Sequence, residues 1–396
     1  MNKNDHEFIQ LRPQRIVKTK AWPMNIPVKV EVVGVSRTMP LSACLCEVET
    51  EDGIKGYGFT AITEEDVVAS AINNVIAPTV MGRDAITTEA IWEELNWVLT
   101  PRGQSGYASH AIAALDIALW DIKAQAMGVP LWRLLGGARE EVPVYTTFGF
   151  GFLSQEELVA AAKHWVAQGN RRLKMTVAGE AMRHRHRRDL EAVIREDAAR
   201  VMAVRDAVGD EVDIYIDANC NLDPVHAFKL AKMLEPVNLG FFEEPVLQND
   251  VRHLSELRRR TTVRIAAGQN EGQAFRFRDL LVEQAVDIIQ PNVAITGGFT
   301  QCVRIAGMAA AFNTSIANGG AWPFHNMHLH AGLANGGLVE YHHPAVLLCE
   351  QIFTGLPVPE NGVLALPKSP GLGFSPNMDA VEEFSRNPSA CGNGKG

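Results

Sequence analysis

Carboxylate and amide side chains recur in the second half of the chain at the points where short apolar runs end. Asp217, Glu243 and Gln269 follow one another at a constant spacing of 26 residues. Oxygen atoms of this kind are the ligands that Mg²⁺ prefers, with positions left open for substrate and water. The Cys and His spacing that is typical of zinc sites is absent. These residues therefore favour chemistry at a hard divalent cation.

Other polar side chains end the remaining apolar runs. Taken singly, each has a simpler explanation: Asp217 to Asn219 could form a turn, and Glu243-Glu244-Pro245 could cap a helix. Together and at a regular period they favour a metal site. A lysine in a barrel interior needs a charged partner, so Lys174 is expected near the acids. The full set is Lys174, Thr176, Asp217, Asn219, Glu243, Glu244, Gln269, Asn270, Glu271, Asn292, Asn318, His325 and Glu340.

The spacing is explained by alternating strands and helices after Val142. Short apolar runs followed by helical segments predict a parallel α/β sheet. Eight such units suggest a closed (β/α) TIM-like barrel, whose functional residues lie at the carboxyl ends of its strands. The expected strands end at Thr147, Thr176, Asp217, Glu244, Gly268, Pro291, Ala317 and Tyr341.

A different pattern precedes the barrel. Residues 27–50 alternate and are rich in Val, which predicts antiparallel strands. Helical stretches are expected over 64–99 and 111–135, so the first part reads as a small α+β domain. The Pro- and Gly-rich segment 357–374 is expected to be irregular. We therefore predict a capping domain over 1–140, a barrel over 141–350 that carries the metal site, and a segment over 351–396 that completes the cap.

Composition narrows the function classes. A net charge of -9 gives no electrostatic reason to expect nucleic-acid binding. The basic run from Arg183 to Arg188 favours a solvated loop, with attraction of an anionic substrate as the alternative. No signal-peptide pattern and no apolar run of about 18 residues is seen, so no membrane partner is expected. The six scattered cysteines favour reduced thiols in a cytoplasmic protein.

The chain resembles the mandelate racemase branch of the enolase superfamily, in the mandelate racemase / muconate lactonizing enzyme family. The resemblance runs over about residues 15–375. The segment from Ser109 to Gly137 looks like the helix and turn that join cap to barrel in that family. The downstream motifs agree in order and spacing, and they are GNRRLKMTVAG, IYIDANCNLD, GFFEEP, AAGQNEG, QPNVAITGGFT, LVEY and PKSPGLGF.

The resemblance implies a mechanism and a ligand set. Family members bind Mg²⁺, with Mn²⁺ as an alternative, and use it to hold a substrate carboxylate while a base removes the neighbouring proton. By position, Asp217 and Glu243 match the first two metal ligands. Gln269 stands where the third ligand is usually Glu, so weaker metal affinity is expected. Asn270 or Glu271 could compensate.

The departures from the family concern the bases. Lys174 matches the first lysine of a usual pair, whereas Thr176 replaces the second. Asn318 and Asn292 occupy the places of the usual His and Asp. The remaining catalytic candidates are Lys174, if its pKa is lowered, and His325, which follows a short loop. Thr176, Asn219, Asn292, Asn318 and Glu340 are then expected to bind substrate, with specificity added by cap segments 22–27 and 59–63.

A dehydratase needs one base and an acid, whereas a racemase needs a base on each face. We therefore expect a Mg²⁺-dependent dehydratase of an aldonate or aldarate, a small-molecule carboxylate. An epimerase or cycloisomerase on the same scaffold is the first alternative. A divergent, non-catalytic sugar-acid-binding protein is the second. Relatives imply a homo-oligomer, either a dimer or an octamer.

Overall fold

The computed structural model describes residues 12–103 and 106–386. The described chain begins with an antiparallel sheet of order β1-β2-β3, formed by β1 (Ile16–Val32), β2 (Val35–Thr50) and β3 (Lys55–Ala61). Alternate residues of β1 are buried, as expected for a sheet with one covered face. Val33 and Gly34 both have positive φ, so a two-residue turn joins β1 to β2.

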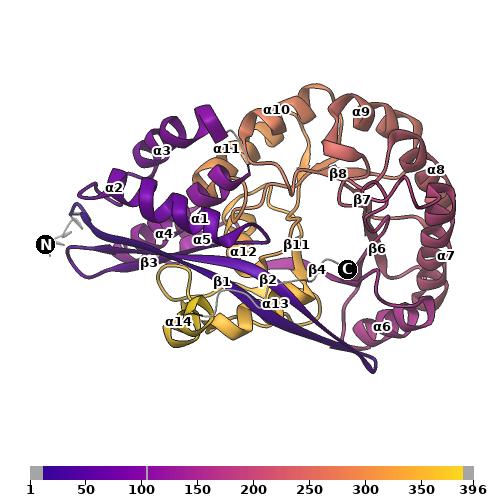
Figure 1. Ribbon diagram of the computed structural model, residues 1–396, viewed down its shortest axis with the longest axis horizontal. Helices are drawn as coiled ribbons and strands as arrows, with labels where there is room; N and C mark the ends of the chain where they lie inside the picture. The colour runs from indigo at the N-terminus through magenta and orange to yellow at the C-terminus, as the bar shows by residue number, and fades with distance from the viewer. Residues whose placement is uncertain (1–11, 104–105, 387–396) are drawn as a thin grey trace, which may run out of the picture.

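The β1–β2 hairpin reaches well beyond the small domain (Figure 1). Its base packs on the cap helices, and its tip lies beside the chain that leads into α6. Val32 belongs to the barrel's hydrophobic core, and the Arg37 guanidinium lies 5.1 Å from the Phe152 ring centroid. The hairpin therefore ties cap and barrel together.

Helices cover the buried face of this sheet. Glycines in β3 allow α4 to approach closely, because a Cβ on Gly58 would lie 1.7 Å from the carbonyl oxygen of Ala114. The close packing fixes the position of His110 and Asp116 on α4. The helical elements of this part are α1 (Glu65–Ala71), η1 (Ile72–Ile76), α2 (Ala77–Val80), α3 (Thr88–Gly103), α4 (Tyr107–Ala126) and α5 (Leu131–Leu134).

Parallel strands form the barrel in the order β10-β9-β8-β7-β6-β5-β4-β11. A hydrogen bond from the Asn318 backbone amide to the Leu338 carbonyl oxygen joins the segment after β10 to the segment before β11. The predicted parallel α/β barrel is confirmed, and each strand ends within a few residues of its expected end. The strands are β4 (Glu141–Gly149), β5 (Arg172–Thr176), β6 (Asp213–Asp217), β7 (Phe241–Glu243), β8 (Ile265–Ala267), β9 (Ile288–Ile289), β10 (Ser315–Ile316) and β11 (Val339–His342).

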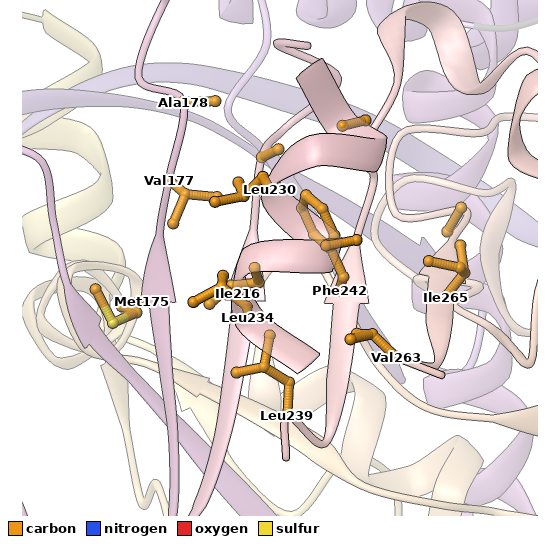
Figure 2. Packing of buried hydrophobic residues seen from close by; sticks show 14 of the residues in the cluster. Met175, Val177, Ala178, Ile216, Leu230, Leu234, Leu239, Phe242, Val263 and Ile265 are labelled. Carbon is orange, nitrogen blue, oxygen red and sulfur yellow. The ribbon is translucent and has the colours of Figure 1, made fainter. Parts of the chain in front are cut away.

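Strand alternation separates two sets of side chains. Ile216, Phe242 and Ile265 point outward and pack against helices such as α8, which contributes Leu230 and Leu234 (Figure 2). Their neighbours Tyr215 and Phe241 point inward and fill the barrel together with Tyr145. The barrel helices are α6 (Gln155–Ala167), α7 (Leu190–Val208), α8 (Pro224–Leu234), α9 (Val251–Arg260), α10 (Ala274–Val282), α11 (Gly298–Ala311), α12 (Pro323–Gly332) and α13 (His343–Ile352).

The C-terminal segment contacts both parts. β13 (Val363–Ala365) pairs with the barrel strand β4, and β12 (Phe353–Thr354) pairs with β14 (Ser375–Pro376). α14 (Met378–Arg386) places Val381 in one core cluster with Met24 and Ile26 of β1. The domain boundaries given above stay a prediction. None of the helices described here is both long and apolar enough to cross a membrane.

Candidate active site

Three carboxylates surround one lysine inside the barrel, at the carboxyl ends of β5, β6, β7 and β11. The Lys174 ammonium lies 2.7 Å from Glu243 Oε2, 2.8 Å from Glu340 Oε1 and 3.3 Å from Asp217 Oδ2. All four side chains are almost completely buried. Regular strand ends therefore bring together residues that are up to 166 positions apart in the sequence.

The pKa values within this cluster reflect an excess of negative charge. Burial alone would lower the pKa of Lys174, but Glu243 and Glu340 raise it well above its usual value. Burial raises the pKa of Glu243 well above its usual range, and Asp217 adds to that shift. Lys174 therefore keeps its proton at neutral pH. The neighbouring acids oppose the lowered pKa that would let Lys174 act as a base, and its catalytic role stays a prediction.

Gln269 lies beside the acids, at the end of β8. Its Nε2 donates to Asp217 Oδ2 at 3.2 Å, to Glu244 Oε2 at 3.1 Å and to Asn219 Oδ1 at 3.3 Å. Glu244 is fully buried and also accepts hydrogen bonds from the side chains of Asn249 and Asn270. The amides therefore compensate the Glu244 charge, and Gln269 reaches the position of the expected third metal ligand.

The chemistry of these side chains fits a divalent cation. Asp217 and Glu243 both accept hydrogen bonds from the Lys174 ammonium, and Glu243 Oε1 is buried without a hydrogen-bond partner among the described residues. A buried carboxylate oxygen without a partner is costly unless a cation occupies its free side. No group of three or more His, Cys, Asp and Glu within the described ranges forms a complete site. An amide in third place, as Gln269 would supply, is consistent with that finding.

A cavity of about 140 Å³ opens above the cluster. Thr176 and Asn219, which were expected to contact substrate, both line it, as do Asp217, Gln269 and Glu340. The Thr176 hydroxyl donates to the Gly149 carbonyl, and the backbone amide of Asn219 donates to Asp217 Oδ1. The remaining lining residues are Ile62, His110, Thr147, Asn270, Ile295, Gly320, Ala321 and His342.

Asn292 and Asn318 are placed differently from the prediction. The Asn292 Nδ2 donates to the carbonyl oxygens of Gly319 and Gly320 at 2.7 and 2.9 Å. The Asn318 side chain donates to Gly319 and accepts from the Glu340 backbone amide. Both are fully buried, and neither lines the cavity. Their amides hold the loop that follows β10, and their expected role in substrate binding stays a prediction.

His325 also lies outside the cavity. It is fully buried on α12, stacks on the Phe59 ring at a centroid distance of 5.2 Å and meets the edges of Phe353 and Phe374. Neither ring nitrogen has a hydrogen-bond partner in the described chain, and burial lowers its pKa to about 3. Aromatic packing therefore separates His325 from the cavity, and its expected role as an acid or base stays a prediction.

Two histidines that the sequence did not single out face the cavity instead. His342 follows Glu340 by two residues on β11, so strand alternation places both on one face. The two-residue period of β11 is therefore a sequence signal that could have identified His342. His110 comes from α4 of the cap and has no spacing relation to the barrel motifs. Of the expected specificity segments, Ile62 lines the cavity, whereas residues 22–27 lie within β1.

Comparison with known proteins agrees with this architecture. Residues 14–136 match the model for the mandelate racemase / muconate lactonizing enzyme N-terminal domain, and residues 157–380 match the enolase C-terminal domain-like model. The second match alone covers more than half of the chain. The protein belongs to the mandelate racemase / muconate lactonizing enzyme family. The resemblance based on its motifs is therefore confirmed.

Several curated members of the family are similar over most of their length. An arabinonate dehydratase from Saccharolobus solfataricus is 30% identical over 353 residues, which are 87% of this chain and 91% of that protein. A 3,6-anhydro-alpha-L-galactonate cycloisomerase from Streptomyces coelicolor is 30% identical, over 80% of this chain and 84% of that protein.

Solved structures of the family superpose on this chain. A racemase from Streptomyces coelicolor with bound magnesium has a TM-score of 0.84 at 27% identity, and covers 93% of this chain and 99% of its own. A family member from a marine actinobacterium, in complex with magnesium, has a TM-score of 0.81 at 29% identity, over 94% and 99% of the two chains.

Proposed function

We propose that this family member is a Mg²⁺-dependent dehydratase of an acid sugar, an aldonate or aldarate, and releases a 2-keto-3-deoxy acid. The observation that carries the proposal is the buried cluster of Asp217, Glu243, Glu340 and Lys174 beneath a small polar cavity. The named dehydratases among its relatives support the same reaction class.

Asp217, Glu243 and Gln269 would hold the cation, with Mn²⁺ as an alternative to Mg²⁺. When bound, it would polarise the substrate carboxylate and so acidify the neighbouring C–H bond. Lys174, held protonated by Glu243 and Glu340, supplies a fixed positive charge at the cavity floor. Such preorganised charge stabilises a transition state in which negative charge spreads over the substrate.

The mouth of the cavity is suited to a polyhydroxylated chain. Thr147 and Thr176 offer hydroxyl groups, and Asn219 and Asn270 offer amides that donate and accept. Ile62 and Ile295 add an apolar wall. A volume of about 140 Å³ favours a compact substrate over the larger ligands of typical drug-sized pockets.

A proton NMR time course tests the reaction. The protein with Mg²⁺ in D₂O is incubated with pooled aldonic and aldaric acids, and new methylene signals would establish dehydration. Glu243→Gln, which removes a proposed metal ligand, is the matched inactive control. Absence of any change across a broad pool, with Mg²⁺ and with Mn²⁺, would contradict the proposal and leave the non-catalytic alternative.

A cycloisomerase is the second candidate, because one similar relative carries that activity. Loss of the α-proton signal without water release, or formation of a ring-opened isomer from an anhydro-sugar acid, would favour it. An epimerase is weakened, because Asn292 and Asn318 occupy the places of a second base and face the loop after β10.

We also propose a cytoplasmic homo-oligomer, either a dimer or an octamer. The described cysteines, Cys44, Cys46, Cys220, Cys302 and Cys349, are all free thiols, which suits a reducing compartment. On the cap, Trp97 and Tyr107 are 68% and 47% exposed, and large apolar side chains of this kind are enriched at interfaces. Light scattering after gel filtration distinguishes these states from a monomer.

A further inference from the structure

We propose that His110 transfers the protons of this reaction and that His342 is a fixed N–H donor to the substrate. His110 Nε2 would remove the proton beside the substrate carboxylate and then protonate the departing hydroxyl. This inference rests on the dehydratase function proposed above. It assigns catalytic residues to a chain in which Thr176 and Asn318 occupy the positions of the family's usual bases.

The two histidines approach the cavity from different parts of the molecule. His110 lies on α4, in the cap, whereas His342 is the last residue of β11, in the barrel. They are the imidazoles among the described residues that line this cavity. Lys174 lies among three acids and outside the cavity lining, and His325 is enclosed by aromatic rings. His110 and His342 are therefore the neutral nitrogen groups available to substrate.

The tautomer of His342 is set by helix capping. His342 is the N-cap residue of α13, and its Nδ1 accepts a hydrogen bond from the Ala345 backbone amide at 3.4 Å. A neutral imidazole with an acceptor at Nδ1 carries its proton on Nε2. Protonation of Nδ1 would break the cap, so His342 presents an N–H group that stays a donor. A neutral histidine at a helix N-terminus is suited to stabilise negative charge on oxygen.

His110 has a partner that permits either tautomer. Its Nδ1 lies 2.6 Å from the hydroxyl oxygen of Thr60, which is fully buried on β3. A hydroxyl both donates and accepts, so Thr60 can donate to a bare Nδ1 or accept from a protonated one. His110 Nε2 can therefore gain and release a proton while the contact with Thr60 persists. No such exchange is available to His342.

Burial keeps both rings neutral before substrate binds. Burial lowers the pKa of His110 to about 4. It also lowers the pKa of His342, although Glu340 acts in the opposite direction. The charged groups nearest this part of the cavity are Asp217, Glu340 and Lys174. His110 is therefore unprotonated at neutral pH, as a base must be before it accepts a proton.

His110 alone can carry out both proton transfers of the dehydration. His110 Nε2 takes the α-proton, the electron pair of that C–H bond forms a carbon–carbon double bond, and the bond to the β-hydroxyl breaks. The departing oxygen takes the proton back from His110 and leaves as water. The His342 N–H group donates a hydrogen bond to a substrate oxygen but gives up no proton. The resulting enol then converts to the 2-keto-3-deoxy acid.

Activity measurements on matched variants test the two roles. With the acid sugar found in the NMR screen, His110→Gln is expected to lower both α-proton exchange and dehydration at least a hundredfold. His342→Gln keeps an N–H donor and should stay within about tenfold of the wild type, whereas His342→Leu should lose about a hundredfold. Thr60→Val should lower kcat, and Thr60→Ser should restore it. Melting temperatures verify that each variant folds.

Nitrogen NMR of protein labelled with ¹⁵N-histidine gives a readout without turnover. The His342 signals, assigned with His342→Gln, are expected to show a proton on Nε2. A proton on Nδ1 would overturn the assigned donor. Full activity of His110→Gln would overturn the assigned base while the dehydratase stands. A wild type inactive on all acids but with the expected tautomer would refute the proposed function and support the assignment of His342 alone.

Discussion

Asp116 of α4 accepts hydrogen bonds from both the backbone amide and the hydroxyl of Thr300, at 3.0 and 2.6 Å. The contact joins the cap to the first turn of the barrel helix α11. It is so close that a Cβ on Gly298 would lie 2.2 Å from Asp116 Oδ2. A carboxylate at a helix N-terminus is favourable, but this one is completely buried.

Stability should therefore depend on pH through Asp116. Burial raises its pKa from 3.8 to about 7, although the bonds from Thr300 oppose the shift. Between these values the folded state binds the proton more tightly than the unfolded state, so the free energy of unfolding falls as pH rises. The change from this group is on the order of 4 kcal/mol over the whole window, of which about 3 kcal/mol falls between pH 5 and pH 7. Urea unfolding at pH 5 and pH 7.5 measures it. Asp116→Asn should flatten the dependence, whereas an unchanged slope would contradict the assignment.

Removing the Lys174 charge should destabilise the protein without metal. Lys174→Met leaves Asp217, Glu243 and Glu340 without their buried cation, and we expect a loss of roughly 3–5 kcal/mol in the presence of a chelator. Lys232→Met is the control, since its pair with Glu235 is exposed to solvent and should contribute little to stability. Equal effects of the two substitutions in urea unfolding would refute the charge argument.

Gln269→Glu should tighten Mg²⁺ binding and weaken the metal-free fold. The substitution supplies a third negative charge, but it removes the donor to Asp217 and Glu244 and places another acid beside them. We expect a lower melting temperature with chelator and at least tenfold higher Mg²⁺ affinity by calorimetry. Mg²⁺ at 100 times its dissociation constant should raise the free energy of unfolding by about 2.7 kcal/mol. Gln168→Glu, on the exposed end of α6, should change neither quantity.

Replacing Asn292 with the aspartate that is usual in the family should destabilise the protein. In Asn292→Asp, the carbonyl oxygens of Gly319 and Gly320 would lose their donor and face a carboxylate, at a cost of roughly 2–4 kcal/mol. Combining it with Asn318→His should not create epimerase activity, because both side chains point away from the cavity lining. Asn74→Asp is an exposed control. Epimerisation detected by α-proton exchange in the double variant would show that the loop can rearrange.

His325→Leu should preserve both stability and activity. The ring nitrogens are buried without partners, so replacing them with carbon removes a desolvation cost of about 1–3 kcal/mol while Phe59 and Phe374 keep an apolar neighbour. Chemical unfolding and the NMR assay measure the two effects. A large loss of activity in this variant, with the fold intact, would show that His325 takes part in the reaction.

The strand-end residues could be predicted because barrel geometry repeats along the chain. Asp217, Glu243 and Glu340 follow apolar runs, and each such run ends at the same rim. Their spacing is therefore enough to place them together. Strand alternation also predicts that His342 shares a face with Glu340.

Other features depend on contacts that sequence spacing does not encode. Gly320, Ala321 and Trp322 all have positive φ, so the loop after β10 turns sharply and α12 carries His325 away from the cavity. Ala and Trp give no signal for this conformation. The pKa of Lys174 depends on acids from three other strands. His110 meets the barrel only through packing of α4, so its role needed three-dimensional information.

The packing of Val381 against Met24 and Ile26 also constrains how the molecule is made. β1 leaves the ribosome before the barrel and α14 after it, so the apolar face of β1 stays partly uncovered while the barrel is synthesised. Domains usually fold in order from the N-terminus, and surfaces left exposed during synthesis are sites of aggregation. The core beneath β1 is therefore completed only after α14 has been synthesised, and deletion of α14 should first lower the yield of folded protein.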